Sequence, residues 1–195
     1  MTKAERTRQF IIEQAAPIFN KKGIAGTSMS DIMEATKLAK GGLYGNFESK
    51  EEISLEVYKY LTDSLNSEIV KSIAGESTAK GKLFALLDFY DTRVFSSDSG
   101  GCPILNFGTE ADDTNPLIKQ KVNESINRFQ GRIATIIKNG QESGEFPQEF
   151  DADMFAVKMF TMIEGAILIT KVQNSNKHLH LVVEMLKAEI ERNIK

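Results

Sequence analysis

The sequence of 195 residues has little of what several protein classes need. It has one cysteine, Cys102, so an internal disulfide is impossible, which fits a reducing cytoplasm. No apolar run is as long as a membrane span, and the first ten residues lack the apolar region of a signal peptide. With only four prolines and with apolar residues at helical spacing, the chain is predicted to be all-α, cytoplasmic and without a membrane segment.

Residues for catalysis and metal binding are also scarce. The two histidines, His178 and His180, stand two apart on a predicted helix and do not share a face, so we expect no metal site. The phosphate-binding pattern GxxxxGK[ST] is absent. Because we find neither a nucleophile with a base nor a pair of carboxylates in an apolar context, we expect no enzyme activity and no cofactor.

The charge of the chain is unevenly distributed. The overall net charge of −3 argues by itself against a nucleic-acid-binding protein. Residues 1–50, however, hold eight Lys or Arg and five acidic residues, a net charge of +3, so the remaining 145 residues carry −6. This asymmetry indicates a basic end that faces DNA and an acidic body, although ordinary surface variation is the alternative.

Short helices follow one another near the N-terminus. Thr2 with Glu5 predicts the start of a helix that runs from about Lys3 to Lys22 and ends at Gly23. Ser28 with Asp31 resembles a second capping box and predicts a helix over 29–35. After a turn, a short helix is predicted over 40–46. This arrangement is a helix-turn-helix, whose second helix enters the DNA major groove.

The segment Thr27 to Lys50, TSMSDIMEATKLAKGGLYGNFESK, resembles the DNA-binding region of the TetR family of transcriptional regulators. The matching positions are Gly41, Leu43, Tyr44, Phe47, Lys50, Glu51 and Glu52. The resemblance implies an N-terminal three-helix DNA-binding domain, a larger C-terminal helical domain for ligand binding and dimerisation, and a near-palindromic double-stranded DNA operator. It also implies a repressor that a small apolar or amphipathic effector releases from that operator.

Candidate DNA-binding residues lie along the whole motif, from just before its first helix to just after its second. We expect Lys40 and Gly41, with Ser30 behind them, to contact base edges. Phosphates would be positioned by Thr27, Ser28, Tyr44, Asn46 and Lys50. Leu43 and Phe47 should belong to the core. Arg6 and Arg8 could touch phosphate or the minor groove, or lie on a solvated surface.

Four residues depart from the family pattern, and one of them is Asn46, which replaces the usual His. Lys37 stands where Gly is common, and a left-handed residue there would carry a penalty of about 1 kcal/mol or more. Ala39 replaces a helix-capping Ser at a cost of roughly 1 kcal/mol, and Gly42 lowers helix propensity. The departures at Lys37, Ala39 and Gly42 motivate an alternative function: a dimer that binds small molecules but has lost specific DNA recognition.

The rest of the chain predicts a helical body. Periodic apolar residues and capping signals predict helices over about 50–74, 79–95, 103–111, 116–143, 152–172 and 177–193, with a loop at 96–101. We therefore divide the chain into a DNA-binding domain, 1–48, and a ligand-binding and dimerisation domain, 49–195. The 152–172 helix is apolar nearly all round, so one side of it is expected to face the body core and the other a second subunit. The resemblance to the TetR family implies that the homodimer forms through the helices at about 116–143 and 152–172.

The body also has the large apolar residues that ligand pockets between helices use. The candidate effector-binding residues are Phe84, Tyr90, Phe107, Glu110, Phe129, Phe155, Met159 and Met162. An ordinary packed core is the alternative for each of them, and for Glu110 a solvated turn or helix cap is the alternative. Cys102 is expected to be a buried structural thiol, with redox or electrophile sensing as the other interpretation.

Overall fold

Capping residues set the starts of the first helices. In the computed structural model, which describes residues 1–96 and 100–194, α1 (Lys3–Gly26) begins at a capping box formed by Thr2 and Glu5. α2 (Met29–Thr36) begins at a capping box formed by Ser28 and Asp31. α3 (Lys40–Tyr44) and α4 (Lys50–Ile73) follow. Both predicted capping boxes are confirmed. Each provides acceptors for backbone N–H groups that have no partner within the helix.

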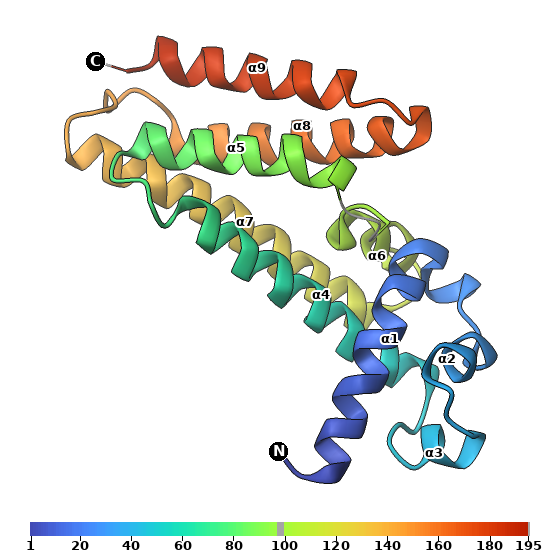
Figure 1. Ribbon diagram of the computed structural model, residues 1–195. Helices are drawn as coiled ribbons and strands as arrows, with labels where there is room; N and C mark the ends of the chain where they lie inside the picture. The colour runs from blue at the N-terminus through green and yellow to red at the C-terminus, as the bar shows by residue number, and fades with distance from the viewer. Residues whose placement is uncertain (97–99, 195) are drawn as a thin grey trace. The chain divides into compact units, whose positions relative to one another are not determined.

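Five more helices follow in the described residues: α5 (Ala79–Ser96), α6 (Pro103–Ala111), α7 (Pro116–Glu142), α8 (Ala152–Gln173) and α9 (Lys177–Arg192) (Figure 1). The predicted all-α fold class is confirmed, and the predicted bounds agree to within two residues except at the end of α1, where Gly23 breaks the helix as predicted and a short helical stretch continues to Gly26. Of the predicted loop at 96–101, residues 97–99 lie outside the described residues. No helix in the described ranges has the length and apolarity that crossing a membrane requires.

The contacts between helices divide the chain into two compact units. The first consists of Met1–Leu65 and Asp98–Val122, so it holds α1 to α3, the first part of α4, and α6. Within it α1 packs against α2 and against α6 (Figure 1). Its fully buried side chains include Phe19, Ile32, Leu43 and Phe47, so the predicted core positions of Leu43 and Phe47 are confirmed.

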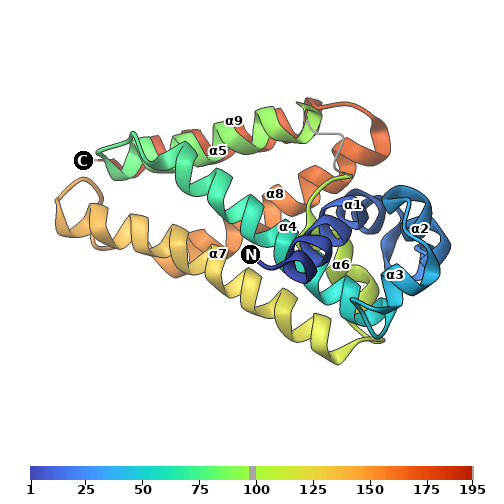
Figure 2. The ribbon, with the colours of Figure 1, turned by 60° about the horizontal axis from the view of Figure 1, so that its bottom comes forward.

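The second unit consists of Asn66–Ser97 and Asn123–Lys195. In it α9 packs against both α5 and α8, as Figures 1 and 2 show. The interior is made of aliphatic and aromatic residues that include Leu83, Leu87, Ile133, Ile163, Leu179, Val183, Leu186 and Ile190, all at most 1% exposed. α6 lies in the predicted second domain, 49–195, but belongs to the first compact unit. The compact units are therefore not the predicted domains, and the division after residue 48 stays a prediction about function.

Candidate DNA-binding surface and effector-binding residues

The N-terminus of α2 is a tightly bonded turn. The Ser28 hydroxyl accepts the Asp31 N–H at 3.1 Å, and the Asp31 carboxylate accepts the Ser28 N–H at 2.8 Å. Lys22 adds an ion pair to Asp31 at 2.7 Å. The bonds from Lys22 and Ser28 hold the pKa of the Asp31 carboxyl well below its usual range. Ser28 and Ser30 are both exposed, at the end of the helix where the dipole favours an anion.

α3 presents a small polar surface to solvent. Lys40, Gly41 and Tyr44 are exposed, while Leu43 is fully buried on the opposite side. The Lys40 ammonium lies 5.6 Å from the centre of the Tyr44 ring. Nothing lies within 4 Å of the position that a Cβ would take on Gly41, so the backbone is open to close approach at that point. A cation, an open backbone and an exposed aromatic hydroxyl thus share one short helix.

α3 has little intrinsic stability. Lys37 adopts the left-handed conformation, with φ of 57°, and Ala39 gives the helix no side-chain cap. Both effects were predicted, and each costs about 1 kcal/mol. A helix of five residues is also shorter than the length at which propensity sustains a helix in water. The surroundings must therefore hold α3 in place.

Arg8 on α1 supplies one of these supports. Its guanidinium lies 4.0 Å from the centre of the Phe47 ring and donates to the Asn46 carbonyl at 2.5 Å. It also pairs with Glu52 at 2.5 Å and with Glu56 at 3.5 Å. The Glu48 N–H and Arg8 together hold the pKa of Glu52 below its ordinary value. Arg8 therefore anchors the segment after α3, and the expected contact with phosphate or the minor groove stays a prediction.

The connection between α1 and α2, residues 23–27, is held from two sides. The Lys50 ammonium donates to the carbonyls of Ile24 at 2.8 Å and of Thr27 at 3.0 Å. From α6, the Glu110 carboxylate accepts the N–H of Ile24 at 2.5 Å and that of Ala25 at 3.3 Å. A carboxylate thus satisfies backbone donors, and an ammonium satisfies backbone acceptors, in the same turn.

Gly23 makes this connection possible. Its φ of 75° breaks α1 and turns the following N–H groups toward Glu110. A Cβ built on Gly23 would lie 1.6 Å from Glu110 Oε1, so any larger residue would displace the carboxylate. The break is therefore required both by backbone conformation and by the approach of a side chain.

The candidate DNA-binding residues fall into two groups. Ser28, Ser30, Lys40, Gly41 and Tyr44 are exposed. Asn46 and Lys50 are half-buried and already bonded, since Asn46 Nδ2 donates to the Gly42 carbonyl at 2.7 Å. Thr27 is only 1% exposed and donates its hydroxyl proton to the Gly23 carbonyl at 2.6 Å. The Thr27 side chain is therefore not accessible in this structure, and its expected contact with a phosphate stays a prediction.

The candidate effector-binding residues are divided between the two compact units. In the first unit, Phe107 packs on Tyr58 with ring centres 5.2 Å apart, and Glu110 is the cap described above. The cap interpretation of Glu110 is therefore the one that matches its contacts. Cys102, at the N-cap of α6, is 4% exposed, so the expected buried thiol is confirmed.

The other six candidates belong to the second unit, and two of them meet. The Tyr90 and Phe129 rings lie edge to face, 5.8 Å apart, and Phe160 lies 5.4 Å beyond Phe129. Phe155 and Met159 are at most 2% exposed, while Met162 and Phe84 are half-buried. Phe155 packs against Phe150 at 5.1 Å, and Phe84 lies under Lys80 and Lys187.

Sequence reasoning missed Arg132, which stands beside this aromatic group. It is half-buried on α7, and it donates a hydrogen bond to the Asn66 side-chain oxygen. The sequence signal was the position of Arg132 three residues after Phe129, on the same face of a helix.

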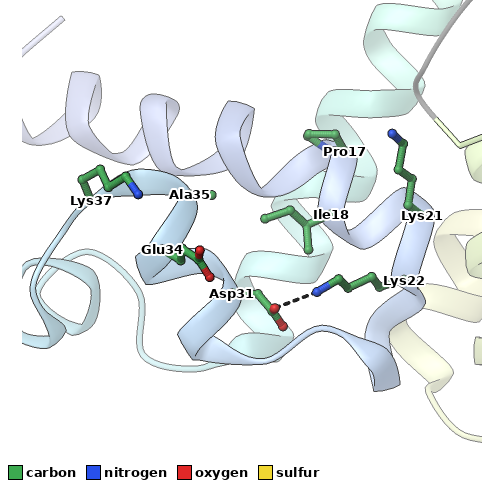
Figure 3. Close-up of a pocket in the computed structure, with 8 residues that line it drawn as sticks. All are labelled: Pro17, Ile18, Lys21, Lys22, Asp31, Glu34, Ala35 and Lys37. Atoms are coloured by element: carbon green, nitrogen blue, oxygen red, sulfur yellow. Dashed lines mark hydrogen bonds and ion pairs between the residues drawn. The ribbon is translucent and has the colours of Figure 1, made fainter.

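A groove of about 560 Å³ lies on the surface of the first unit, between α1 and α2 (Figure 3). The Lys22–Asp31 ion pair crosses it, as Figure 3 shows. Its lining residues are Pro17, Ile18, Lys21, Lys22, Asp31, Glu34, Ala35 and Lys37. None of the candidate effector-binding residues is among them. The groove therefore belongs to the surface of the helix-turn-helix and is distinct from the aromatic group at Tyr90.

Comparisons with known proteins cover both parts of the chain. Residues 11–57 match the family model described as bacterial regulatory proteins, tetR family, and residues 79–186 match the model of the tetracyclin repressor-like C-terminal domain. The chain is similar to the crystal structure of a TetR transcriptional regulator from Chloroflexus aurantiacus J-10-FL, with 34% identity, coverage of 100% of this chain and 98% of that one, and a TM-score of 0.95.

A TetR-family transcriptional regulator from Cytophaga hutchinsonii is 37% identical, with the same coverage and a TM-score of 0.92. Among curated proteins, the HTH-type transcriptional regulator TtgR of Pseudomonas putida is 28% identical over 172 residues, which are 84% of this chain and 80% of TtgR.

Proposed function

We propose that this chain, which belongs to the TetR family of transcriptional regulators, is a homodimeric cytoplasmic repressor that a small amphipathic effector releases from a near-palindromic operator. The observation that carries the proposal is the exposed surface of α3. There Lys40, Gly41 and Tyr44 face solvent on a helix-turn-helix whose inner residues, Leu43 and Phe47, are at most 1% exposed. A surface of this kind is held from inside by buried residues and is polar enough to read a major groove.

Within that surface we assign different roles to different residues. Lys40 and Gly41, with Ser30 behind them, contact base edges, since they surround the N-terminal end of α3. Ser28, Tyr44 and Asn46 position the phosphates. Lys50 supports Ser28 through its bonds to the Ile24 and Thr27 carbonyls, so its contribution to phosphate binding is through the α1–α2 connection.

We propose that the homodimer forms through α8 and α9. Apolar side chains remain exposed along both helices: Met154, Val157, Leu168, Ile169 and Val172 on α8, and Leu181 and Met185 on α9. On α7, by contrast, Leu117 is the one large apolar side chain exposed in the described residues. A stable dimer needs a contiguous apolar patch at its centre. These exposures support α9 rather than the 116–143 helix as the partner of α8 in the interface.

The effector would cause release of the operator through a movement of α6. The Glu110 carboxylate accepts hydrogen bonds from the N–H groups of Ile24 and Ala25, just before the exposed N-terminus of α2. An effector that draws α6 away from α1 removes this acceptor and loosens the segment that places Ser28. An effector can lower operator affinity only by its differential affinity for the two arrangements, typically 1 to 3 kcal/mol.

The proposal is tested by fluorescence anisotropy of the full-length protein with labelled DNA from directly upstream of its own gene, against scrambled DNA, at about 50 and 200 mM salt. We expect tighter binding to the upstream DNA at both salt concentrations. Lys40→Ala should reduce the preference for that sequence, whereas Lys59→Ala, which removes an exposed α4 lysine, should not.

If neither the upstream DNA nor operators selected from random DNA bind in preference to scrambled DNA, the regulator assignment fails. The chain would then be a small-molecule-binding dimer without DNA recognition. The uncapped α3 and the left-handed Lys37 are the observations that favour this second function.

A further inference from the structure

Among the residues that the structure describes, three arginines are half-buried, and one of them has no acidic partner there. Arg8 pairs with Glu52 and Glu56, and Arg93 pairs with Glu68 at 2.9 Å. Arg132 donates to the neutral side-chain oxygen of Asn66, and no carboxylate among the described residues forms an ion pair with it. Burial lowers the pKa of Arg132, and the positive charge of Arg128 acts in the same direction.

The Arg132 guanidinium has fewer hydrogen-bond and charge partners than a half-buried arginine normally has. Charged groups that leave bulk water are normally paired, because desolvation otherwise costs several kcal/mol. The guanidinium has five N–H donors in a planar fork, and one amide oxygen satisfies only part of them. A carboxylate matches the fork with two parallel hydrogen bonds. A planar anion would therefore satisfy N–H donors of Arg132 that the described part of the chain leaves open.

Apolar and polar groups stand on either side of the guanidinium. Phe129 lies one helical turn before Arg132 on α7. The centre of its ring is 5.8 Å from that of Tyr90 and 5.4 Å from that of Phe160. Tyr90 is 3% exposed and close enough to interact electrostatically with Arg132. The Asn66 amide nitrogen is a second donor beside the guanidinium. Asn66, Tyr90, Phe129, Arg132 and Phe160 all belong to the second compact unit.

We propose that Arg132, with Asn66 and Tyr90, binds the anionic end of the effector, and that the effector is an amphipathic carboxylate whose apolar body packs on Phe129 and Phe160. The inference rests on the proposed function in that it names the chemical class of the effector. A structural role, in which Arg132 only ties α7 to α4 through Asn66, predicts a different response to mutation. Removing a purely structural tie destabilises the protein, whereas removing a half-buried charge kept for a ligand does not.

The test is isothermal titration calorimetry of the full-length protein with 1-naphthoate, octanoate and dodecanoate, each beside its neutral amide of the same shape. We expect at least one carboxylate to bind about tenfold or more tightly than its amide, because charge-assisted hydrogen bonds are formed only with the carboxylate. Arg132→Met should abolish this preference, and Arg132→Lys should retain part of it. Arg128→Met, which removes an exposed arginine four residues earlier on α7, should change it by about twofold at most.

Thermal unfolding of the same variants without ligand separates the two roles. The ligand role predicts that Arg132→Met unfolds at the same temperature as the wild type or higher. The inference is overturned if all three carboxylates fail to bind, if the amides bind equally well, or if Arg132→Met keeps the preference. A lowered unfolding temperature with an unchanged preference assigns Arg132 to structure alone. Operator anisotropy on the same preparations reports on the regulator function separately, since loss of carboxylate binding leaves that measurement intact.

Discussion

Replacing Lys50 by Met would separate the structural role of its ammonium group from direct phosphate binding. In the structure the ammonium donates to the carbonyls of Ile24 and Thr27, at 2.8 and 3.0 Å. Methionine keeps most of the apolar stem and removes both hydrogen bonds. Hydrogen bonds to a charged group contribute about 1.5 to 3 kcal/mol when water cannot replace them. Because Lys50 is only half-buried, water will re-bond the carbonyls, and we expect a total loss of about 1 to 2 kcal/mol.

That loss should be visible in thermal unfolding. For a chain of this size, 1 kcal/mol corresponds to a shift of about 2 to 4 °C, so Lys50→Met should unfold about 2 to 8 °C lower than the wild type. Lys59→Met, which removes an exposed cation from the same helix, should stay within about 0.5 kcal/mol of the wild type. The comparison isolates the two carbonyl bonds from the general effect of removing a lysine.

The salt dependence of operator binding gives the decisive measurement. A lysine that touches phosphate releases a counter-ion, so its loss from both subunits of a dimer reduces the slope of log K against log salt by about 1.8. A lysine that bonds only to carbonyls leaves the slope unchanged and weakens binding by misplacing Ser28. We expect the second result, with a drop in affinity of about tenfold. A reduced slope together with an unchanged unfolding temperature would refute the structural assignment and restore Lys50 as a phosphate ligand.

Three other predictions concern the stability of α3, its support by Arg8 and the dimer interface. Lys37→Gly should raise the free energy of unfolding by about 1 kcal/mol in urea titrations, because glycine adopts a φ of 57° without strain; an unchanged midpoint would contradict this. Arg8→Met should lower operator affinity without changing the salt slope, since Arg8 bonds to Asn46, Glu52 and Glu56; a smaller slope would instead make it a phosphate contact. Met185→Glu should yield monomers in size-exclusion chromatography with light scattering, whereas Leu117→Glu should leave dimers, and the reverse would place the interface on α7.

Structural features that depend on residues close together in the sequence were predicted correctly. The capping boxes at Thr2 and Ser28 act over three residues, and both are present. The prediction that Lys37 is left-handed and that Ala39 leaves α3 uncapped rested on local chemistry, and it is confirmed. Helix periodicity gave the bounds of α4 and of the later helices to within two residues because each of them has a continuous apolar stripe.

The roles of charged residues were not readable in the same way. Arg8 meets Asn46 across 38 positions of sequence, and Glu110 meets Ile24 across 86. A sequence shows that a residue is charged, but the fold decides whether a backbone carbonyl or amide stands opposite it. Lys50 was expected to meet phosphate, and Arg132 could have been an ordinary surface cation. Long-range partners of this kind need the structure.

The low intrinsic stability of α3 makes its position depend on the residues that hold it, and this dependence bears on regulation. Lys37 and Ala39 leave the helix short of about 2 kcal/mol of local stability, so its order depends on Arg8 and on the buried Leu43 and Phe47. Marginal local stability makes the position of a helix sensitive to small changes at its supports. An effector that alters the cap from Glu110 would therefore change DNA affinity without touching Lys40 or Gly41. Under the proposed function, regulation and base reading would thus be carried by different residues, and a mutation in one set should leave the other intact.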